Sequence, residues 1–152
     1  MKFDKSKKLL VIGRAGMDIY PEPPGTKISD VQEFSTHLGG SAANTCVALS
    51  KLGVSSDLVT CISDDAIGEY IFKKLEDFNV GSNLCRRVDK KFQTQVAVVE
   101  TILKNNQSIL YRNNSCDLQL DKEDIDKINF QDYSAVFISG TALSSSPSRE
   151  AV

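Results

Sequence analysis

A pair of glycines followed by small and polar residues is the part of this sequence best suited to hold a ligand. The run is Gly39-Gly40-Ser41-Ala42-Ala43-Asn44. Two glycines let the backbone turn tightly and approach a ligand closely. Ser41 can cap a following helix, and Asn44 can donate and accept hydrogen bonds near its N-terminus. The run predicts a polar-ligand site. A plain turn, with Asn44 bonded to backbone, is the simpler alternative.

Three charged side chains could complete such a site. Asp18 follows an apolar run and can accept hydrogen bonds from hydroxyls. Arg112 carries a planar guanidinium that pairs well with a carboxylate, and Arg14 offers the same chemistry just after a predicted strand. The simpler alternatives are a loop aspartate bonded to its own backbone and a solvated arginine on a hairpin. His37, the single histidine, is assigned no catalytic role.

The elements that must position these side chains follow the order of an α/β protein. Apolar residues at helical spacing predict helices at 41–52 and 65–78, the second capped by Asp64 or Asp65. A further short helix is predicted after Asp121, through residue 128. Short apolar runs are typical of strands buried on both faces of a parallel sheet, and they stand at 9–13, 57–63 and 134–140.

A β-rich insertion interrupts this alternation. Residues 93–103 and 108–113, joined by a turn, predict an antiparallel hairpin with one apolar face. Residues 31–38 are predicted to be extended and to lead into the glycine pair. A loop is predicted at 21–25, because three of its five residues are proline. The chain ends after the last strand without a predicted closing helix, which indicates an interrupted fold.

Composition and charge exclude several classes of function. A net charge of −2 gives no general attraction to nucleic acid or to an anionic membrane. No apolar stretch is long enough to span a membrane, and no signal-peptide core is found. The four cysteines form no C-x-x-C pair, so neither a zinc site nor a disulfide framework is expected. A cytoplasmic protein fits these features best.

Together, the motifs resemble the N-terminal half of the PfkB (ribokinase-like) family of carbohydrate kinases, from about residue 9 to the end of the chain. The family's ligand-contacting aspartate, its Gly-Gly pair and its asparagine correspond in this sequence to Asp18, Gly39, Gly40 and Asn44. Its Gly-Asp-Asp-x-x-Gly turn corresponds to residues 63–68.

Two positions depart from the signature. Cys46 stands where Ser, Thr or Ala is usual, and Ser63 stands where Gly is usual. Both changes exchange one small residue for another, so they bear on backbone fit more than on the family resemblance.

The resemblance implies a parallel sheet flanked by helices with a small β-lid, whose segments lie near 19–38 and 92–114. Residues 1–152 would form the N-terminal part of a single kinase domain. The lid would close over the sugar and pair with a second subunit; a purely structural hairpin is the alternative. The family's ATP- and Mg-binding half, with its catalytic aspartate, is not found in the sequence. No catalytic or metal-binding residue is therefore assigned, and the chain alone is expected to be inactive.

Within the family, the nearest resemblance is to the 5-dehydro-2-deoxygluconokinases of myo-inositol breakdown. It implies a sugar-acid substrate phosphorylated at its terminal hydroxyl, with Arg112 and Arg14 as candidates for binding the carboxylate. Related keto-sugar-acid kinases, such as those acting on 2-keto-3-deoxygluconate, share much of the pattern. The segments that carry the resemblance are 13–15, 20–27, 39–44, 111–118 and 139–144.

Three other interpretations remain open. The chain could be a non-catalytic sugar-binding or dimerisation module, or a truncated product with no function of its own. A dinucleotide-binding oxidoreductase is a weaker alternative. Gly13 and Gly16 faintly suggest a phosphate-binding turn, but the G-x-G-x-x-G pattern is absent and prolines follow where a helix would be needed.

Overall fold

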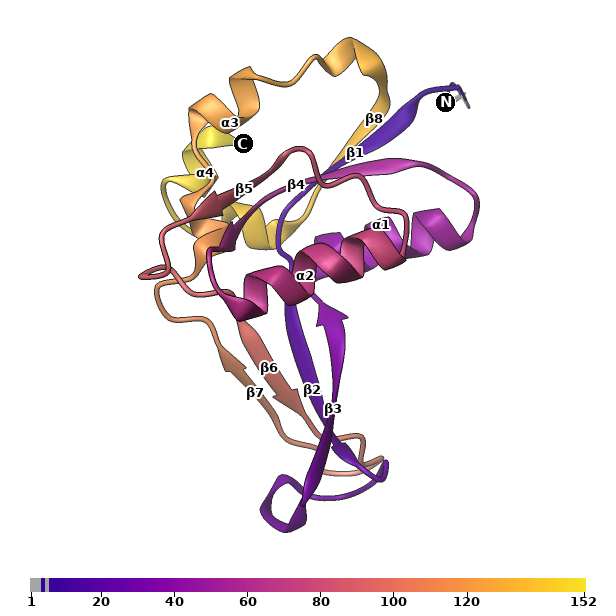
Figure 1. Ribbon diagram of the computed structural model, residues 1–152, viewed down its shortest axis with the longest axis vertical. Helices are drawn as coiled ribbons and strands as arrows, with labels where there is room; N and C mark the ends of the chain where they lie inside the picture. The colour runs from indigo at the N-terminus through magenta and orange to yellow at the C-terminus, as the bar shows by residue number, and fades with distance from the viewer. Residues whose placement is uncertain (1–3, 5) are drawn as a thin grey trace.

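The computed structural model describes residues 4 and 6–152 and contains two four-stranded sheets (Figure 1). The first sheet is parallel, with the strand order β5-β4-β1-β8. Its strands are β1 (Lys8–Ile12), β4 (Ser56–Ser63), β5 (Cys85–Val88) and β8 (Tyr133–Ile138). The predicted α/β architecture with a parallel sheet is confirmed.

Side-chain alternation along the inner strands explains why they read as continuous apolar runs. In β1, Val11 faces a core formed with helices α1 (Ser41–Lys51) and α2 (Ala66–Asp77). The neighbouring Leu10 and Ile12 face a second core on the other side of the sheet. Successive residues of a strand point to opposite faces, so a strand covered on both sides needs apolar residues at every position.

The second core lies under a run of short helical segments late in the chain. Leu120 and Ile128 pack there against the sheet, around α3 (Lys122–Asp126). Short 3-10 helices supply the remaining turns, at Ile28–Asp30, Cys116–Gln119, Phe130–Asp132 and Gly140–Leu143. A four-residue helix, α4 (Ser148–Ala151), follows the last strand and was not predicted.

The prediction that 134–140 is buried on both faces is also wrong. Val136, Phe137 and Ile138 of β8 are 43%, 47% and 42% exposed. The reason is the strand order: β8 is the outer strand of its sheet and pairs with β1 on one side only. An apolar run identifies a strand, but it does not show whether that strand lies inside the sheet or at its edge.

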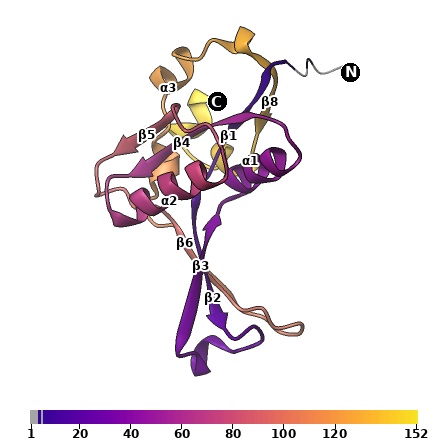
Figure 2. The same cartoon turned by 45° about the vertical axis from the view of Figure 1, so that its right-hand side comes forward.

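The second sheet projects from the α/β body, and we call it the projecting sheet (Figures 1 and 2). Its strand order is β3-β2-β6-β7. The predicted hairpin is confirmed as the antiparallel pair β6–β7, although its strands are shorter than the apolar runs suggested. The bounds are β2 (Gly16–Glu22), β3 (Glu33–Gly39), β6 (Val96–Val99) and β7 (Ser108–Tyr111).

Strand β2 corrects the prediction of a loop from residue 21. Pro21 lies inside β2, opposite Phe34 of β3. It is tolerated there because β2 pairs with β6 only over Met17–Ile19. Beyond that stretch β2 has a single neighbour, and a residue without an N–H group disrupts less.

Helix boundaries follow their capping residues, with one correction. Asp65 caps α2, accepting a hydrogen bond from the backbone N–H of Gly68 at 2.9 Å. Asp121 forms a reciprocal capping box with Asp124 at α3. Ser41, predicted to cap α1, is instead its first residue, because Gly40 makes the turn into the helix. Within the described part of the chain, no helix is long and apolar enough to cross a membrane.

Candidate functional site

The predicted ligand-binding residues meet where the projecting sheet joins the parallel sheet. β1 ends at Ile12, and β2 starts four residues later at Gly16, so Arg14 lies in the connection between the two sheets. β3 ends at Gly39, directly before helix α1. The junction lies at the carboxyl end of β1, the edge where open α/β sheets bind ligands.

Gly39 leaves room for the carboxylate of Asp18. A Cβ atom at Gly39 would lie 2.1 Å from the Asp18 Oδ1 atom, far inside contact distance. The two strands β2 and β3 are paired here, so no rotation of the backbone could relieve such a clash locally. Gly39 therefore leaves the space that the Asp18 carboxylate occupies. The predicted close approach of the glycine pair to a ligand stays a prediction.

Gly40 brings the start of α1 against the segment that carries Arg14. Its φ of +96° is disfavoured for residues with a side chain, and a Cβ would lie 2.4 Å from the carbonyl oxygen of Arg14. The same carbonyl accepts a hydrogen bond from the backbone N–H of Ala43 at 3.3 Å. The second glycine thus fixes the distance between the helix and the β1–β2 connection.

We expect Gly40→Ala to destabilise the chain by more than about 3 kcal/mol, because backbone strain and a clash with the Arg14 carbonyl add together. Gly53→Ala is the matched control. Gly53 also has a positive φ, +75°, but nothing lies within 4 Å of its would-be Cβ, so its loss should be about 1 kcal/mol. Urea unfolding measures both. Equal losses would show that the clash at Gly40 is relieved at no cost.

The side chain of Arg112 is largely buried and links two segments of the chain. It is not the solvated charge that was its simpler interpretation. Its side chain is 19% exposed, and its Nη2 atom donates to Asp117 Oδ2 at 2.7 Å. The same nitrogen donates to the carbonyl oxygen of Thr141 at 3.1 Å. Arg112 therefore ties the end of β7 to the segment after β8. Asp117, the partner of Arg112, was not recognised in the sequence, since an aspartate five residues away carries no signal of burial.

Arg14 differs from Arg112, because its guanidinium has no partner among the described residues. Within residues 4 and 6–152, its side chain forms no ion pair or hydrogen bond, and its Nε atom is buried without a partner. Burial lowers the pKa of Arg14, and the positive charge of Arg112 lowers it further, while Asp117 and Asp18 act in the opposite direction. Two guanidinium groups near each other favour binding of an anion.

Asp18 completes the charge pattern of the junction. Burial raises its pKa, and the positive charge of Arg14 and the interaction with His37 only partly offset that effect. His37 lies opposite Asp18 in the β2–β3 pair, with its ring edge-on to Tyr20 at a centroid distance of 5.3 Å. An ionised aspartate that is costly to bury is well placed to accept hydrogen bonds from ligand hydroxyls.

We expect Asp18→Asn to raise the melting temperature by about 1–3 °C at pH 7. The pKa of Asp18 is raised in the folded state. The stability that its neutral carboxyl contributes is therefore fully present below the ordinary pKa of aspartate, and it is lost as the pH rises through the folded-state pKa. The gain should therefore vanish below about pH 3.9. Thermal melts at both pH values test this, with the exposed Asp126→Asn as control. A lower melting temperature at pH 7 would contradict it.

Asn44 lies in the first turns of α1 and is exposed. Its side chain forms no hydrogen bond with any described residue, so the alternative in which it is bonded to backbone is not found here. Thr45 is the residue of this turn that makes such a bond, from Oγ1 to the carbonyl oxygen of Ser41 at 2.8 Å. The amide of Asn44 is thus free to bind a ligand.

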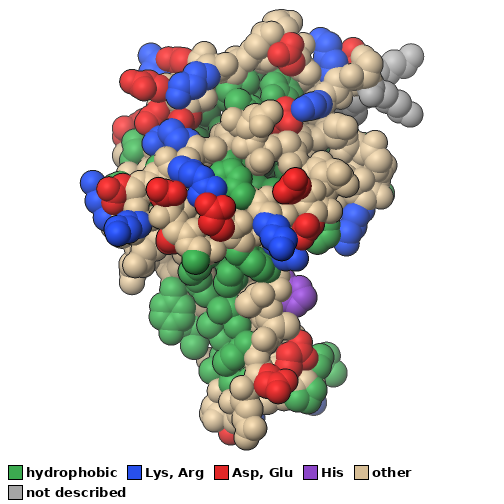
Figure 3. All heavy atoms as spheres, in the orientation of Figure 1, with side chains coloured by type: hydrophobic (Ala, Val, Ile, Leu, Met, Phe, Trp, Pro, Cys, Tyr) green, Lys and Arg blue, Asp and Glu red, His purple; other side chains and the backbone are tan. Residues whose placement is uncertain are grey.

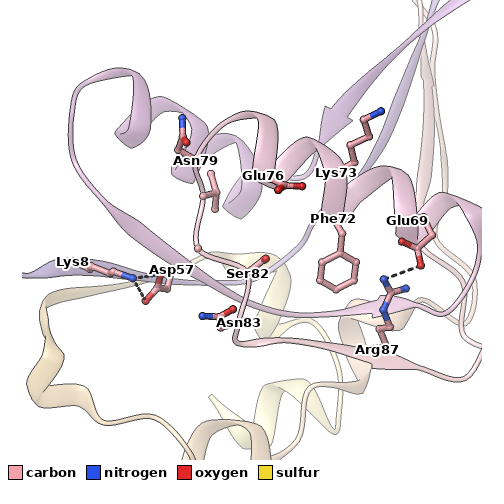
Figure 4. Close-up of a pocket in the computed structure, with 12 residues that line it drawn as sticks. Lys8, Asp57, Glu69, Phe72, Lys73, Glu76, Asn79, Ser82, Asn83 and Arg87 are labelled. Atoms are coloured by element: carbon pink, nitrogen blue, oxygen red, sulfur yellow. Dashed lines mark hydrogen bonds and ion pairs between the residues drawn. The ribbon is translucent and has the colours of Figure 1, made fainter.

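A surface hollow lies elsewhere. It has a volume of about 760 Å³ and lies between α2, β5 and the start of β1 (Figure 4). Its charges are largely paired: Lys8 with Asp57 at 2.9 Å, and Arg87 with Glu69 at 2.9 Å. Lys8 begins β1, so this part of the hollow is at the opposite edge of the sheet from Arg14 and Asp18. The hollow therefore does not belong to the candidate site.

Curated proteins of similar sequence are named as sugar-acid kinases. The chain is 35% identical over 148 residues to the 5-dehydro-2-deoxygluconokinase of Photobacterium profundum, covering 97% of this chain and 45% of that protein. It is 34% identical over 154 residues to the enzyme of the same name from Clostridium perfringens, covering 99% and 46%. The chain thus spans about half the length of the curated relatives it matches.

Solved structures agree on the fold. A sugar kinase from Pyrococcus horikoshii, with ATP bound, has a TM-score of 0.80 and 28% identity, covering 94% of this chain and 46% of that one. The fructokinase of Halothermothrix orenii has a TM-score of 0.79 and 25% identity, covering 95% and 50%. The model of the pfkB family of carbohydrate kinases matches residues 6–152. With nearly its whole length matched in this way, the chain belongs to the pfkB carbohydrate kinase family.

Proposed function

We propose that this chain is the sugar-binding half of an ATP-dependent kinase that phosphorylates 5-dehydro-2-deoxy-D-gluconate at its terminal hydroxyl, in the breakdown of myo-inositol. The observation that carries the proposal is the uncommitted guanidinium of Arg14, held next to Arg112 and Asp18. A half-buried guanidinium without a partner among the described residues suits a substrate with a carboxylate. The names of the relatives support the same substrate.

Different residues of the junction bind different groups of the substrate. Arg14 pairs with the carboxylate, and Arg112 adds its positive charge and its unpartnered Nε atom. Asp18 and Asn44 bind hydroxyls, and the glycines Gly39 and Gly40 allow the backbone to approach the sugar. The other keto-sugar-acid kinases, including those acting on 2-keto-3-deoxygluconate, would use the same division, so they form the second candidate substrate class.

The projecting sheet is proposed as the lid, with its segments near 19–38 and 92–114. Figure 3 shows apolar side chains gathered on this sheet. On strands β3 and β7, Phe34, Leu110 and Tyr111 are 48%, 47% and 59% exposed. Exposed apolar side chains on one sheet suit contact with a second copy, so a homodimer through the lid is the proposed assembly. All four cysteines are free, which fits a reducing compartment, and we place the protein in the cytoplasm.

No described residue is assigned to ATP or magnesium. Over residues 4 and 6–152, no three His, Cys, Asp or Glu side chains are grouped to hold a metal ion. No phosphoryl-transfer step is assigned to the residues of this chain, and we propose that it is inactive by itself. In the complete enzyme, the nucleotide and its metal would be held by residues outside these 152.

Calorimetric titration of the purified chain with 5-dehydro-2-deoxygluconate tests the proposal. We expect binding that is at least tenfold tighter than that of the neutral sugar D-fructose, because only the acid can pair with Arg14. Release of ADP from ATP with the same substrate should be absent. Equal affinity for acid and neutral sugar would contradict the assignment of substrate. Turnover by the chain alone would contradict its inactivity, and 2-keto-3-deoxygluconate binding more tightly would favour the second candidate.

A further inference from the structure

Gln95 is a buried polar residue for which the fold supplies no hydrogen-bond partner. Its side chain is 1% exposed, and neither Oε1 nor Nε2 has a partner in the part of the chain that the structure describes. A buried amide without hydrogen bonds lowers the stability of the folded state. An apolar residue of the same size would serve packing better, so the amide calls for another explanation.

The position of Gln95 is fixed by strand β2. The backbone N–H of Met17 donates to the Gln95 carbonyl oxygen at 3.1 Å, and Met17 lies in register with Val96. Gln95 therefore stands beside Gly16. A Cβ at Gly16 would lie 2.1 Å from Gln95 Nε2, so this glycine makes room for the amide.

The amide lies on the same face of the projecting sheet as Asp18. Gly16 and Asp18 are two residues apart on β2, so their side-chain positions point to one face. Gly16 pairs with Gly39, and Gly39 makes room for the carboxylate of Asp18 as Gly16 does for Gln95. Two glycines on paired strands thus accommodate two polar groups, an acceptor carboxylate and a donor–acceptor amide.

Arg112 lies next to Gln95, at the end of the neighbouring strand β7. β6 and β7 pair with Val96 opposite Tyr111, so Gln95 and Arg112 are the next residues at that end of the hairpin. The opposite face of β2 and β3 is apolar, since Met17 and Leu38 pack into the core under α1 and α2. The polar face is therefore the one that meets the candidate site.

We propose that Gln95 is a substrate-contacting residue, whose amide donates one hydrogen bond to the sugar acid and accepts another. This inference rests on the proposed function of the junction. A donor and an acceptor on one amide suit a hydroxyl oxygen next to a keto or second hydroxyl oxygen. The chemical class recognised is thus a chain with oxygen on adjacent carbons, bound between the carboxylate of Asp18 and the guanidinium of Arg112.

The test uses Gln95→Met, which keeps length and removes the amide, with the exposed Gln93→Met as the matched control. Without sugar, we expect Gln95→Met to raise the melting temperature by about 2–5 °C, because it removes an unpartnered buried amide. Titration with 5-dehydro-2-deoxygluconate should show affinity lowered at least tenfold. The control should change neither quantity. If Gln95 had a purely structural role, Gln95→Met would lower the melting temperature and leave the affinity for the sugar acid unchanged.

The outcomes separate this inference from the proposed function. If the unaltered chain binds the sugar acid and Gln95→Met binds it equally well, Gln95 is not a contact and the proposed function stands. If the unaltered chain binds no sugar acid, both fall. If Gln95→Met does not fold, Gln95→Ala is measured in its place, and loss of stability in both variants assigns the amide to the fold and overturns the inference.

Discussion

Replacing Arg112 with Met is expected to destabilise the chain by about 3–5 kcal/mol, the loss typical of leaving one partner of a buried ion pair behind. The Asp117 side chain is 2% exposed, and its Oδ2 atom lies 2.7 Å from Arg112 Nη2. Without the guanidinium, that carboxylate keeps only the hydroxyl of Ser115 as a side-chain partner among the described residues. The hydrogen bonds from Arg112 to Thr141 and Ser144 are lost as well.

Two further variants show whether the uncompensated charge is the cause. Arg149→Met removes an exposed arginine that lies 3.7 Å from Glu150, and its loss should be under about 1 kcal/mol. The double variant Arg112→Met with Asp117→Leu removes both charges and should recover most of the lost stability. Urea unfolding measures all of these. If the double variant is no more stable than Arg112→Met, the loss comes from packing and not from the unpaired carboxylate.

This arrangement changes how the two arginines are weighed as carboxylate ligands. The sequence analysis names both arginines as candidates. The structure gives Arg112 a structural partner, whereas Arg14 has none among the residues described. For binding a carboxylate, Arg112 therefore offers its positive charge and its Nε atom, whereas Arg14 offers its whole guanidinium.

The parallel sheet was predictable because burial on both faces leaves a local signal. Leu10, Val11 and Ile12 are consecutive in the chain, yet they pack into two different cores. Strand β5 left no such signal, because Arg86 and Arg87 make up half of it. Arg86 is stabilised there by Asp124, whose Oδ1 atom lies 2.7 Å from its Nε atom, in a helix almost forty residues later. A single sequence does not show such a distant pair.

Some residues of the candidate site could likewise be predicted from the sequence, and others could not. Asp18, Gly39 and Gly40 could be proposed from the sequence, since their spacing matches a known motif and the glycines have a local geometric reason. Gln95 could not, because nothing in Thr94-Gln95-Val96 marks the glutamine as buried or unpartnered. Its importance depends on Gly16, almost eighty residues away in the chain and adjacent in the sheet. Sequence motifs find residues shared by a family, and contacts between distant segments require the fold.

Replacing Arg14 with Met is expected to lower the affinity for a sugar acid by about 10- to 100-fold. A hydrogen bond to a charged group is worth about 1.5–3 kcal/mol, and 1.4 kcal/mol corresponds to tenfold. The fold itself should not suffer. Arg14 has no ion-pair partner in the described chain, and burial together with Arg112 already disfavours its charge. The melting temperature of Arg14→Met should therefore equal or exceed that of the unaltered chain.

Calorimetric titration with a sugar acid and with a neutral sugar separates charge recognition from a general loss of binding. For Arg14→Met, affinity for the acid should fall, and affinity for the neutral sugar should be unchanged. Arg14→Lys keeps the charge and loses the planar fork, so its affinity for the acid should be intermediate. If Arg14→Met binds the acid as the unaltered chain does, the carboxylate is bound elsewhere, and Arg112 becomes the remaining candidate at this junction. Because no described residue pairs with it, the charge of Arg14 destabilises the folded state, and a carboxylate-bearing ligand would offset that cost.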